Sequence, residues 1–217
     1  RMVANMAYPK DLTPQHLKLP NILNYSTKFG HCIQNILISK GPVFVYSNFV
    51  TKGGVNDFAA ALEANGIHNY TSTLQSKFKY GIFRASKDEE NLKLLETFNN
   101  VKNKNGNVIK IIIGSPAMKE GISLKNTREV HLLDPYWNKS RTEQVIGRAI
   151  RFCSHVALPQ SQRRVDVFHY AIKNLHKKLT VDQHIMKIMI RKGSLIEQFE
   201  NILYKSSIDC PYFHQAN

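Results

Sequence analysis

Short, nearly uninterrupted apolar runs recur along the chain. They occupy residues 43–46, 80–84, 108–113, 130–133 and 165–170. Runs of this length, bounded by polar residues, predict strands that are buried on both faces of a sheet.

Between these runs, apolar residues recur at helical spacing. Helices are predicted from Ser26 or Thr27 to Leu37, over 57–65 and over 88–98. Strands that alternate with helices predict an α/β fold, with a mainly parallel sheet covered by helices on both faces.

The two ends of the chain depart from this alternation. Residues 1–24 contain three prolines and predict an irregular linker that enters the domain. Residues 180–204 return to helical spacing, with a candidate break at Gly193. This helix either covers the sheet or docks another domain or protein. We therefore divide the chain into a linker at 1–24, an α/β domain at 25–175 and a helical appendage at 176–217.

The chain is strongly basic. Thirty Lys and Arg residues against sixteen Asp and Glu give a formal net charge of +14. Such an excess favours a polyanionic partner, with nucleic acid as the first candidate, over a basic surface that only aids solubility.

Other compositional features exclude several classes of protein. The three cysteines form no close pair and the nine histidines follow no ligand spacing, so neither a disulfide framework nor a metal site is expected. No apolar run approaches the eighteen residues that span a bilayer, and we expect no membrane partner.

The most informative motif is Q-x-x-G-R-x-x-R, at residues 144–151. On a helix, Gln144, Arg148 and Arg151 would share one face, at positions i, i+4 and i+7. Two forked cations directed at one place suit a polyphosphate, whose oxygens gain charge during transfer. The alternative is a solvated polar helix face.

Further motifs surround this one at characteristic places. Ser47-Asn48-Phe49 follows the first strand, residues 114–124 read GSPAMKEGISL, and residues 133–138 read LDPYWN. With residues 144–151 they resemble motifs IV, V and VI of superfamily 2 helicases and translocases, and the D-x-x-W-N segment of their Swi/Snf-type branch. The resemblance covers residues 26–175 and implies a C-terminal RecA-like domain.

A narrower resemblance lies in and after motif VI. G-R-A-I-R-x-x-S-H-V at 147–156, R-R-V-x-V at 163–167 and T-V-D at 180–182 resemble transcription ATPases of large DNA viruses. That group includes the poxvirus nucleoside triphosphate phosphohydrolase I, the small subunit of the poxvirus early transcription factor, and asfarvirus relatives. The resemblance implies a role in viral transcription, in the virion and the viral factories of the host cytoplasm, with a viral RNA polymerase or transcription factor subunit as a partner.

The family resemblance also implies roles near the nucleotide. Arg148 and Arg151 would be arginine fingers, and Gln144 would bind near the nucleotide or couple it to nucleic acid. Gly121 and Gly147 would allow close backbone approach. The Ser123 hydroxyl would reach the ribose, although family members often have Asp or Asn there. Glu120 would hydrogen-bond in the same cleft or be a surface acid.

A second set of residues resembles the contacts that the family makes with the nucleic-acid backbone. Ser47, Asn48 and Ser115 would contact phosphates, since hydroxyls and amides position a strand without reading its sequence. Lys52 and Lys119 lie near enough in sequence to join them, or are solvated charges. The Swi/Snf-like segment favours DNA over RNA. Trp137 is expected to pack under motif VI or to stack on a base.

The chain has no G-x-x-x-x-G-K-[ST] loop and no Asp-Glu pair after an apolar strand. We therefore expect ATP and Mg²⁺ to be bound mainly by an N-terminal RecA-like domain, and this chain alone to be inactive. The function expected is the second motor domain of a viral nucleic-acid-dependent ATPase. The alternative is a non-enzymatic module of a viral transcription factor that docks nucleic acid or polymerase.

Overall fold

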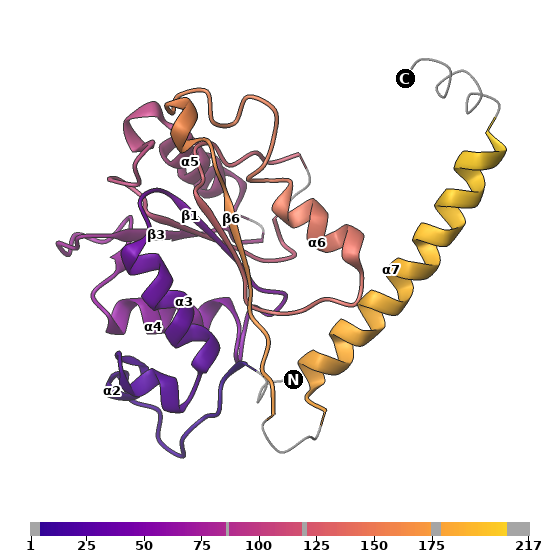
Figure 1. Ribbon diagram of the computed structural model, residues 1–217. Helices are drawn as coiled ribbons and strands as arrows, with labels where there is room; N and C mark the ends of the chain where they lie inside the picture. Colours follow the sequence, from indigo (N-terminus) through magenta and orange to yellow (C-terminus); the bar gives the residue numbers. More distant parts are fainter. Residues whose placement is uncertain (1–4, 86, 119–120, 175–178, 208–217) are drawn as a thin grey trace.

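The computed structural model describes residues 5–85, 87–118, 121–174 and 179–207. Its centre is a six-stranded sheet in the order β2-β3-β4-β1-β5-β6, in which every pairing is parallel (Figure 1). The strands are β1 (Val43–Tyr46), β2 (His68–Asn69), β3 (Lys79–Ile82), β4 (Ile111–Gly114), β5 (Glu129–Leu132) and β6 (Asp166–His169). The predicted α/β architecture is thus confirmed.

Helices cover both faces of this sheet. One face packs against α3 (Thr27–Ile38) and α4 (Val55–Ala64), the other against α5 (Asp88–Asn99) and α6 (Lys139–Ile146). Successive β1 residues alternate between the two layers, because side chains of a strand point to opposite faces: Val43 joins the first core and Phe44 the second. Three single 3-10 turns complete the domain, η1 (Asn21–Asn24), η2 (Val101–Asn103) and η3 (Gln160–Gln162).

The N-terminal segment is packed rather than irregular over its described residues, 5–24. It forms the short helix α2 (Pro14–Leu17) and η1. Met6 and Ile22 are fully buried in the core that contains α3 and α4. The prediction of irregular structure is therefore wrong for these residues, because scattered apolar residues find partners that local spacing does not reveal. The role of the segment as a linker stays a prediction.

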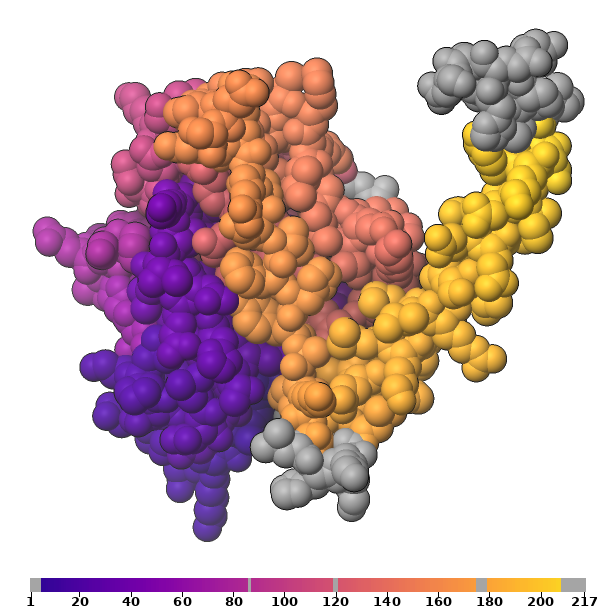
Figure 2. Space-filling model, in the orientation of Figure 1, coloured from indigo at the N-terminus to yellow at the C-terminus, as the bar shows by residue number. Residues whose placement is uncertain are grey.

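The last described element, α7 (Val181–Ser206), is a single helix of 26 residues that leaves the body of the domain (Figures 1 and 2). Its start is fixed by the capping box of Thr180 and Gln183 and by a buried ion pair of 2.6 Å between Lys28 and Asp182. Gly193 lies inside the helix and does not break it.

The C-terminal half of α7 does not cover the sheet. The structure therefore contradicts the first of the two alternatives for this helix, that it covers the sheet. Five apolar side chains on one face of this half are more than half exposed, namely Leu195, Ile196, Phe199, Ile202 and Leu203. We call these five residues the α7 stripe. Among the described residues, no helix has both the length and the hydropathy to cross a membrane.

Candidate nucleotide and nucleic-acid site

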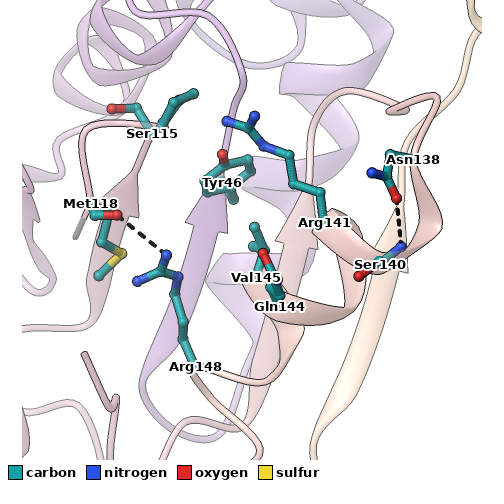
Figure 3. Close-up of a pocket in the computed structure, with 10 residues that line it drawn as sticks. Tyr46, Ser115, Met118, Asn138, Ser140, Arg141, Gln144, Val145 and Arg148 are labelled. Atoms are coloured by element: carbon teal, nitrogen blue, oxygen red, sulfur yellow. Dashed lines mark hydrogen bonds between the residues drawn. The ribbon is translucent and has the colours of Figure 1, made fainter. Parts of the chain in front are cut away.

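The candidate site lies at the carboxyl ends of β1, β4 and β5, where ligands of parallel α/β sheets usually bind. A cavity of about 340 Å³ opens between these strand ends and α6 (Figure 3). We call it the α6 cavity. It is lined by Tyr46, Ser115, Pro116, Met118, Asn138, Ser140, Arg141, Gln144, Val145 and Arg148.

A second hollow, of about 370 Å³, adjoins the α6 cavity. Its lining residues are Gly121, Gln144, Gly147, Arg148 and Arg151. All five were predicted as site residues from the sequence, although they come from motifs V and VI. The structure thus places the two motifs at one location. The chemical roles of the five residues stay predictions.

The two arginines do not lie on the helix that contains Gln144, as the sequence predicted. Helix α6 ends at Ile146, with Gly147 as its C-cap. The chain then tightens into shorter-range hydrogen bonds, from Arg148 N–H to the Val145 carbonyl and from Ala149 N–H to the Ile146 carbonyl. The apolar spacing continues through this turn, which explains why the sequence resembled an unbroken helix.

Arg151 is exposed, and its guanidinium contacts the motif V loop. Its Nη1 donates to the Gly121 carbonyl at 3.0 Å and to the Ser123 hydroxyl at 2.8 Å. Arg148 is half-buried, and its Nη2 donates to the Met118 carbonyl at 3.3 Å. These acceptors carry no formal charge, so a phosphate would be a stronger partner for either arginine than the contacts described.

Ser47 is displaced from its predicted role. The side chain is fully buried and its hydroxyl donates to Asp134 at 2.7 Å. The same carboxylate accepts the Asn48 backbone N–H at 2.8 Å. Because this hydroxyl already donates to a buried carboxylate and does not line the α6 cavity, Ser47 holds the motif IV loop in this structure and does not present its hydroxyl to a phosphate.

The carboxyl group of Asp134 is the centre of this loop's packing. Burial raises its pKa, and the hydrogen bonds from Ser47, Asn5 and Asn48 oppose that shift. Asn5 also donates to the Gly53 carbonyl at 2.8 Å and accepts a hydrogen bond from the Lys28 ammonium at 2.8 Å. The N-terminal segment, the motif IV loop and α3 are therefore linked by one buried polar network.

The other residues that were predicted to contact the nucleic-acid backbone occupy different environments. Asn48 is half-buried, and its amide oxygen is buried without a hydrogen-bond partner among the described residues. Lys52 is exposed. Ser115 is buried at the rim of the α6 cavity, where its hydroxyl accepts the Ala117 N–H at 3.3 Å. Lys119 and Glu120 lie outside the described residues.

Trp137 does not pack under motif VI. It is 40% exposed before α6, its ring is tilted by 31° to that of Tyr136, and the Lys192 ammonium lies 4.1 Å from its ring centre. Trp137 therefore connects the start of α6 to α7. This contact could not be predicted from local sequence spacing, because Lys192 is distant in sequence.

Sequence reasoning missed one cation of the site, Arg141. It lines the α6 cavity, and its position three residues before Gln144 and seven before Arg148 is the spacing of one helix face. That spacing was the available signal. The described residues contain no cluster of three or more His, Cys, Asp or Glu that could hold a metal ion.

The sequence model of the helicase conserved C-terminal domain family matches residues 28–153. The chain therefore belongs to this family, and the resemblance to superfamily 2 helicases is confirmed. The matched region contains the motif IV loop, the motif V loop and motif VI, the segments that form the candidate site.

Individual relatives come from large DNA viruses. The chain is 38% identical over 229 residues to an Acanthamoeba polyphaga mimivirus protein named as an ATP-dependent RNA helicase, covering 100% of this chain and 40% of the relative. It is 30% identical over 236 residues to an African swine fever virus protein named as a homolog of the termination factor NPH-I, covering 87% of this chain and 33% of the relative. The chain thus spans less than half of the length of either.

A solved structure supports the fold. The C-terminal part of the Fun30 ATPase domain superposes with a TM-score of 0.51 at 18% identity, over 79% of this chain and 47% of that one. At this identity the comparison establishes the RecA-like architecture alone.

Proposed function

We propose that the chain is the second motor domain of a viral superfamily 2 ATPase that depends on nucleic acid and acts in transcription. The observation that supports this most strongly is the hollow in which Arg148 and Arg151 meet Gly121 and Gly147. It places two guanidinium groups and two residues without side chains at the open end of a parallel sheet, as a triphosphate site shared with another domain would need.

In this proposal, ATP and Mg²⁺ are bound mainly by an N-terminal RecA-like domain, because this sequence contains neither a G-x-x-x-x-G-K-[ST] loop nor an Asp-Glu pair after an apolar strand. When the two domains close, Arg151 exchanges its carbonyl and hydroxyl acceptors for phosphate oxygens. The exchange is favourable since charge-assisted hydrogen bonds to an anion are stronger than those to neutral oxygens. Arg148 and Gln144 bind beside it, and Ser123, once released, is free to contact the ribose.

Nucleic acid would bind along the neighbouring loops. Ser115 and Asn48 stand at the strand ends, and Lys52 is exposed near them. The net charge of +14 supports binding to a polyanion. The D-x-x-W-N segment favours DNA, whereas the names of several mimivirus relatives specify RNA. We place the activity in the virion and viral factories, with the viral transcription machinery as partner.

The arginine-finger role is tested by replacing Arg151 with Ala in the longer protein. We expect kcat for ATP hydrolysis to fall by roughly 10³-fold, because the guanidinium stabilises charge that develops in the transition state. The Kd for ATP should change far less. Steady-state hydrolysis and nucleotide-binding titrations measure the two effects.

Arg164→Ala is the control for that experiment. Arg164 is an exposed arginine at the start of β6, the opposite end of the sheet, where it pairs with Asp166 at 2.7 Å. Its loss should leave kcat unchanged. Wild-type turnover by the Arg151→Ala protein would exclude the arginine-finger assignment.

A second function is favoured by a different observation, the exposed α7 stripe. Five large apolar side chains on one face of a projecting helix suit a docking element for a polymerase or a transcription factor subunit. This function is compatible with the motor and does not need it.

A further inference from the structure

The α6 cavity contains a cation that the helicase motifs do not include. Arg141 lies on the first turn of α6, outside the Q-x-x-G-R-x-x-R pattern. Figure 3 shows Ser115, Arg141 and Arg148 on different sides of the Tyr46 ring, around one open space. Strand β1, the motif V loop and α6 each contribute to this space.

The charge in this cavity is of one sign. Its ten lining residues include two arginines and no carboxylate. The described contacts of Arg141 are with neutral groups, the hydroxyls of Tyr46 and Tyr136. An excess of positive charge among the lining residues attracts an anion, because the cavity walls also limit screening by water.

The guanidinium of Arg141 is held in place before any ligand arrives. It lies 4.8 Å from the centre of the Tyr136 ring, and its Nη1 is 3.3 Å from the Tyr136 hydroxyl. Hydrogen bonding to Tyr46 raises the pKa of Arg141 further, so that the group stays charged. A long side chain that is already ordered loses less conformational entropy on binding.

The other polar groups of the cavity suit a phosphate. Hydroxyls of Ser115 and Ser140 and the amide of Asn138 line the same space. Side chains of these types bind phosphate oxygens without reading base identity. The volume of about 340 Å³ accepts a phosphate together with part of a sugar.

We propose that the α6 cavity is a phosphate-binding site in which Arg141 is a binding residue beside Arg148. The phosphate belongs either to a nucleic-acid backbone or to a nucleotide, since both present the same oxygens. The inference does not depend on Arg151 being an arginine finger, because Arg151 does not line this cavity.

The first test replaces Arg141 with Gln in this chain. Binding of labelled 20-nucleotide single-stranded and duplex DNA and RNA is followed by anisotropy over a range of salt, and binding of tripolyphosphate by calorimetry. We expect about a tenfold loss of affinity for at least one probe. The matched control is Arg164→Gln, which removes the same charge from an exposed site at the other end of the sheet.

The probes separate the two sources of phosphate. Weaker oligonucleotide binding, with a salt slope smaller by about one ion, assigns the site to a strand. Weaker tripolyphosphate binding alone assigns it to a nucleotide. If Arg141→Gln and Arg164→Gln bind all probes equally, the proposal is wrong, even where Arg151→Ala still lowers kcat.

A second variant keeps the test decisive if Arg141→Gln does not fold. Ser140 is exposed on the first turn of α6, where an acidic residue is compatible with the helix. Ser140→Glu should repel a phosphate from the cavity and weaken binding about tenfold. Its control is Ser161→Glu, an exposed serine of η3 with the same change of charge. Equal binding by these two variants would overturn the proposal.

Discussion

Four charged side chains among the described residues lie where water is largely excluded. They are less than a tenth exposed, namely Lys28, Lys110, Asp134 and Asp182. A buried charge is costly unless other groups compensate it, and these are compensated differently. Lys28 pairs with Asp182, and Asp134 accepts several hydrogen bonds. The Lys110 ammonium donates a hydrogen bond to the Ser39 carbonyl at 2.6 Å and lies over the face of an aromatic ring.

The weaker compensation of Lys110 predicts a specific dependence of stability on pH. Burial lowers the pKa of Lys110 to about 8, below the usual value near 10.4 that it regains on unfolding. Between these values the unfolded chain binds more protons than the folded one, so the free energy of unfolding rises with pH. We expect a contribution of about 1 kcal/mol between pH 8 and 9. Urea denaturation at pH 7, 8 and 9 measures it.

The comparison that isolates this effect is between Lys110→Met and Lys102→Met, which changes an exposed lysine. The Lys102 variant should keep the wild-type rise of stability with pH, while the Lys110 variant should lose about 1 kcal/mol of it. The same rise in both variants would show that Lys110 does not titrate in this range.

At the scale of elements, five of the six strands were predictable from their apolar runs. The edge strand β2 was not, because its two residues, His68 and Asn69, are polar and only partly buried. The end of α6 was not, since Ile146 and Ile150 continue the apolar spacing past the turn at Gly147. The packing of Met6 and the burial of Ser47 depend on distant partners and have no local signal. Site residues were predictable where motifs define them. Arg141 was not identified, because it lies outside the motifs and its partner Tyr46 comes from β1, which is distant in sequence.

Helix α7 offers a test at this scale, since a buried ion pair fixes its start. Asp182 bonds the Lys28 ammonium at 2.6 Å and accepts the Ile172 N–H at 2.9 Å. Asp182→Asn leaves a buried ammonium without its counter-ion and should cost about 3 kcal/mol. Hydrogen exchange should accelerate near residue 181 more than in β1. Glu197→Gln, farther along the same helix, should change neither quantity. Equal protection in both variants would mean that the ion pair does not anchor α7.

The whole molecule combines two surfaces with different chemistry. The α/β body presents its motif arginines at one end of the sheet, in a chain with an excess of positive charge. Helix α7 carries exposed apolar side chains away from that body (Figure 2). Cations suit a nucleic acid or nucleotide, whereas the α7 stripe suits a protein. The two activities should therefore be separable by mutation.

We predict that Phe199→Ser combined with Ile202→Ser abolishes docking to the transcription machinery without affecting hydrolysis. Both side chains are more than 60% exposed, so their loss should leave the Tm of the domain nearly unchanged. Burying them in an interface contributes about 1.5–3 kcal/mol each, so affinity for a polymerase or transcription factor subunit should fall at least about a hundredfold. The longer protein is immobilised on a surface, and its binding of the polymerase or transcription factor subunit is measured. Its ATP turnover is measured alongside. Gln198→Ser with Asn201→Ser, two polar changes on the same helix, is the control. If the apolar and polar pairs bind the machinery equally well, the α7 stripe is not the docking surface.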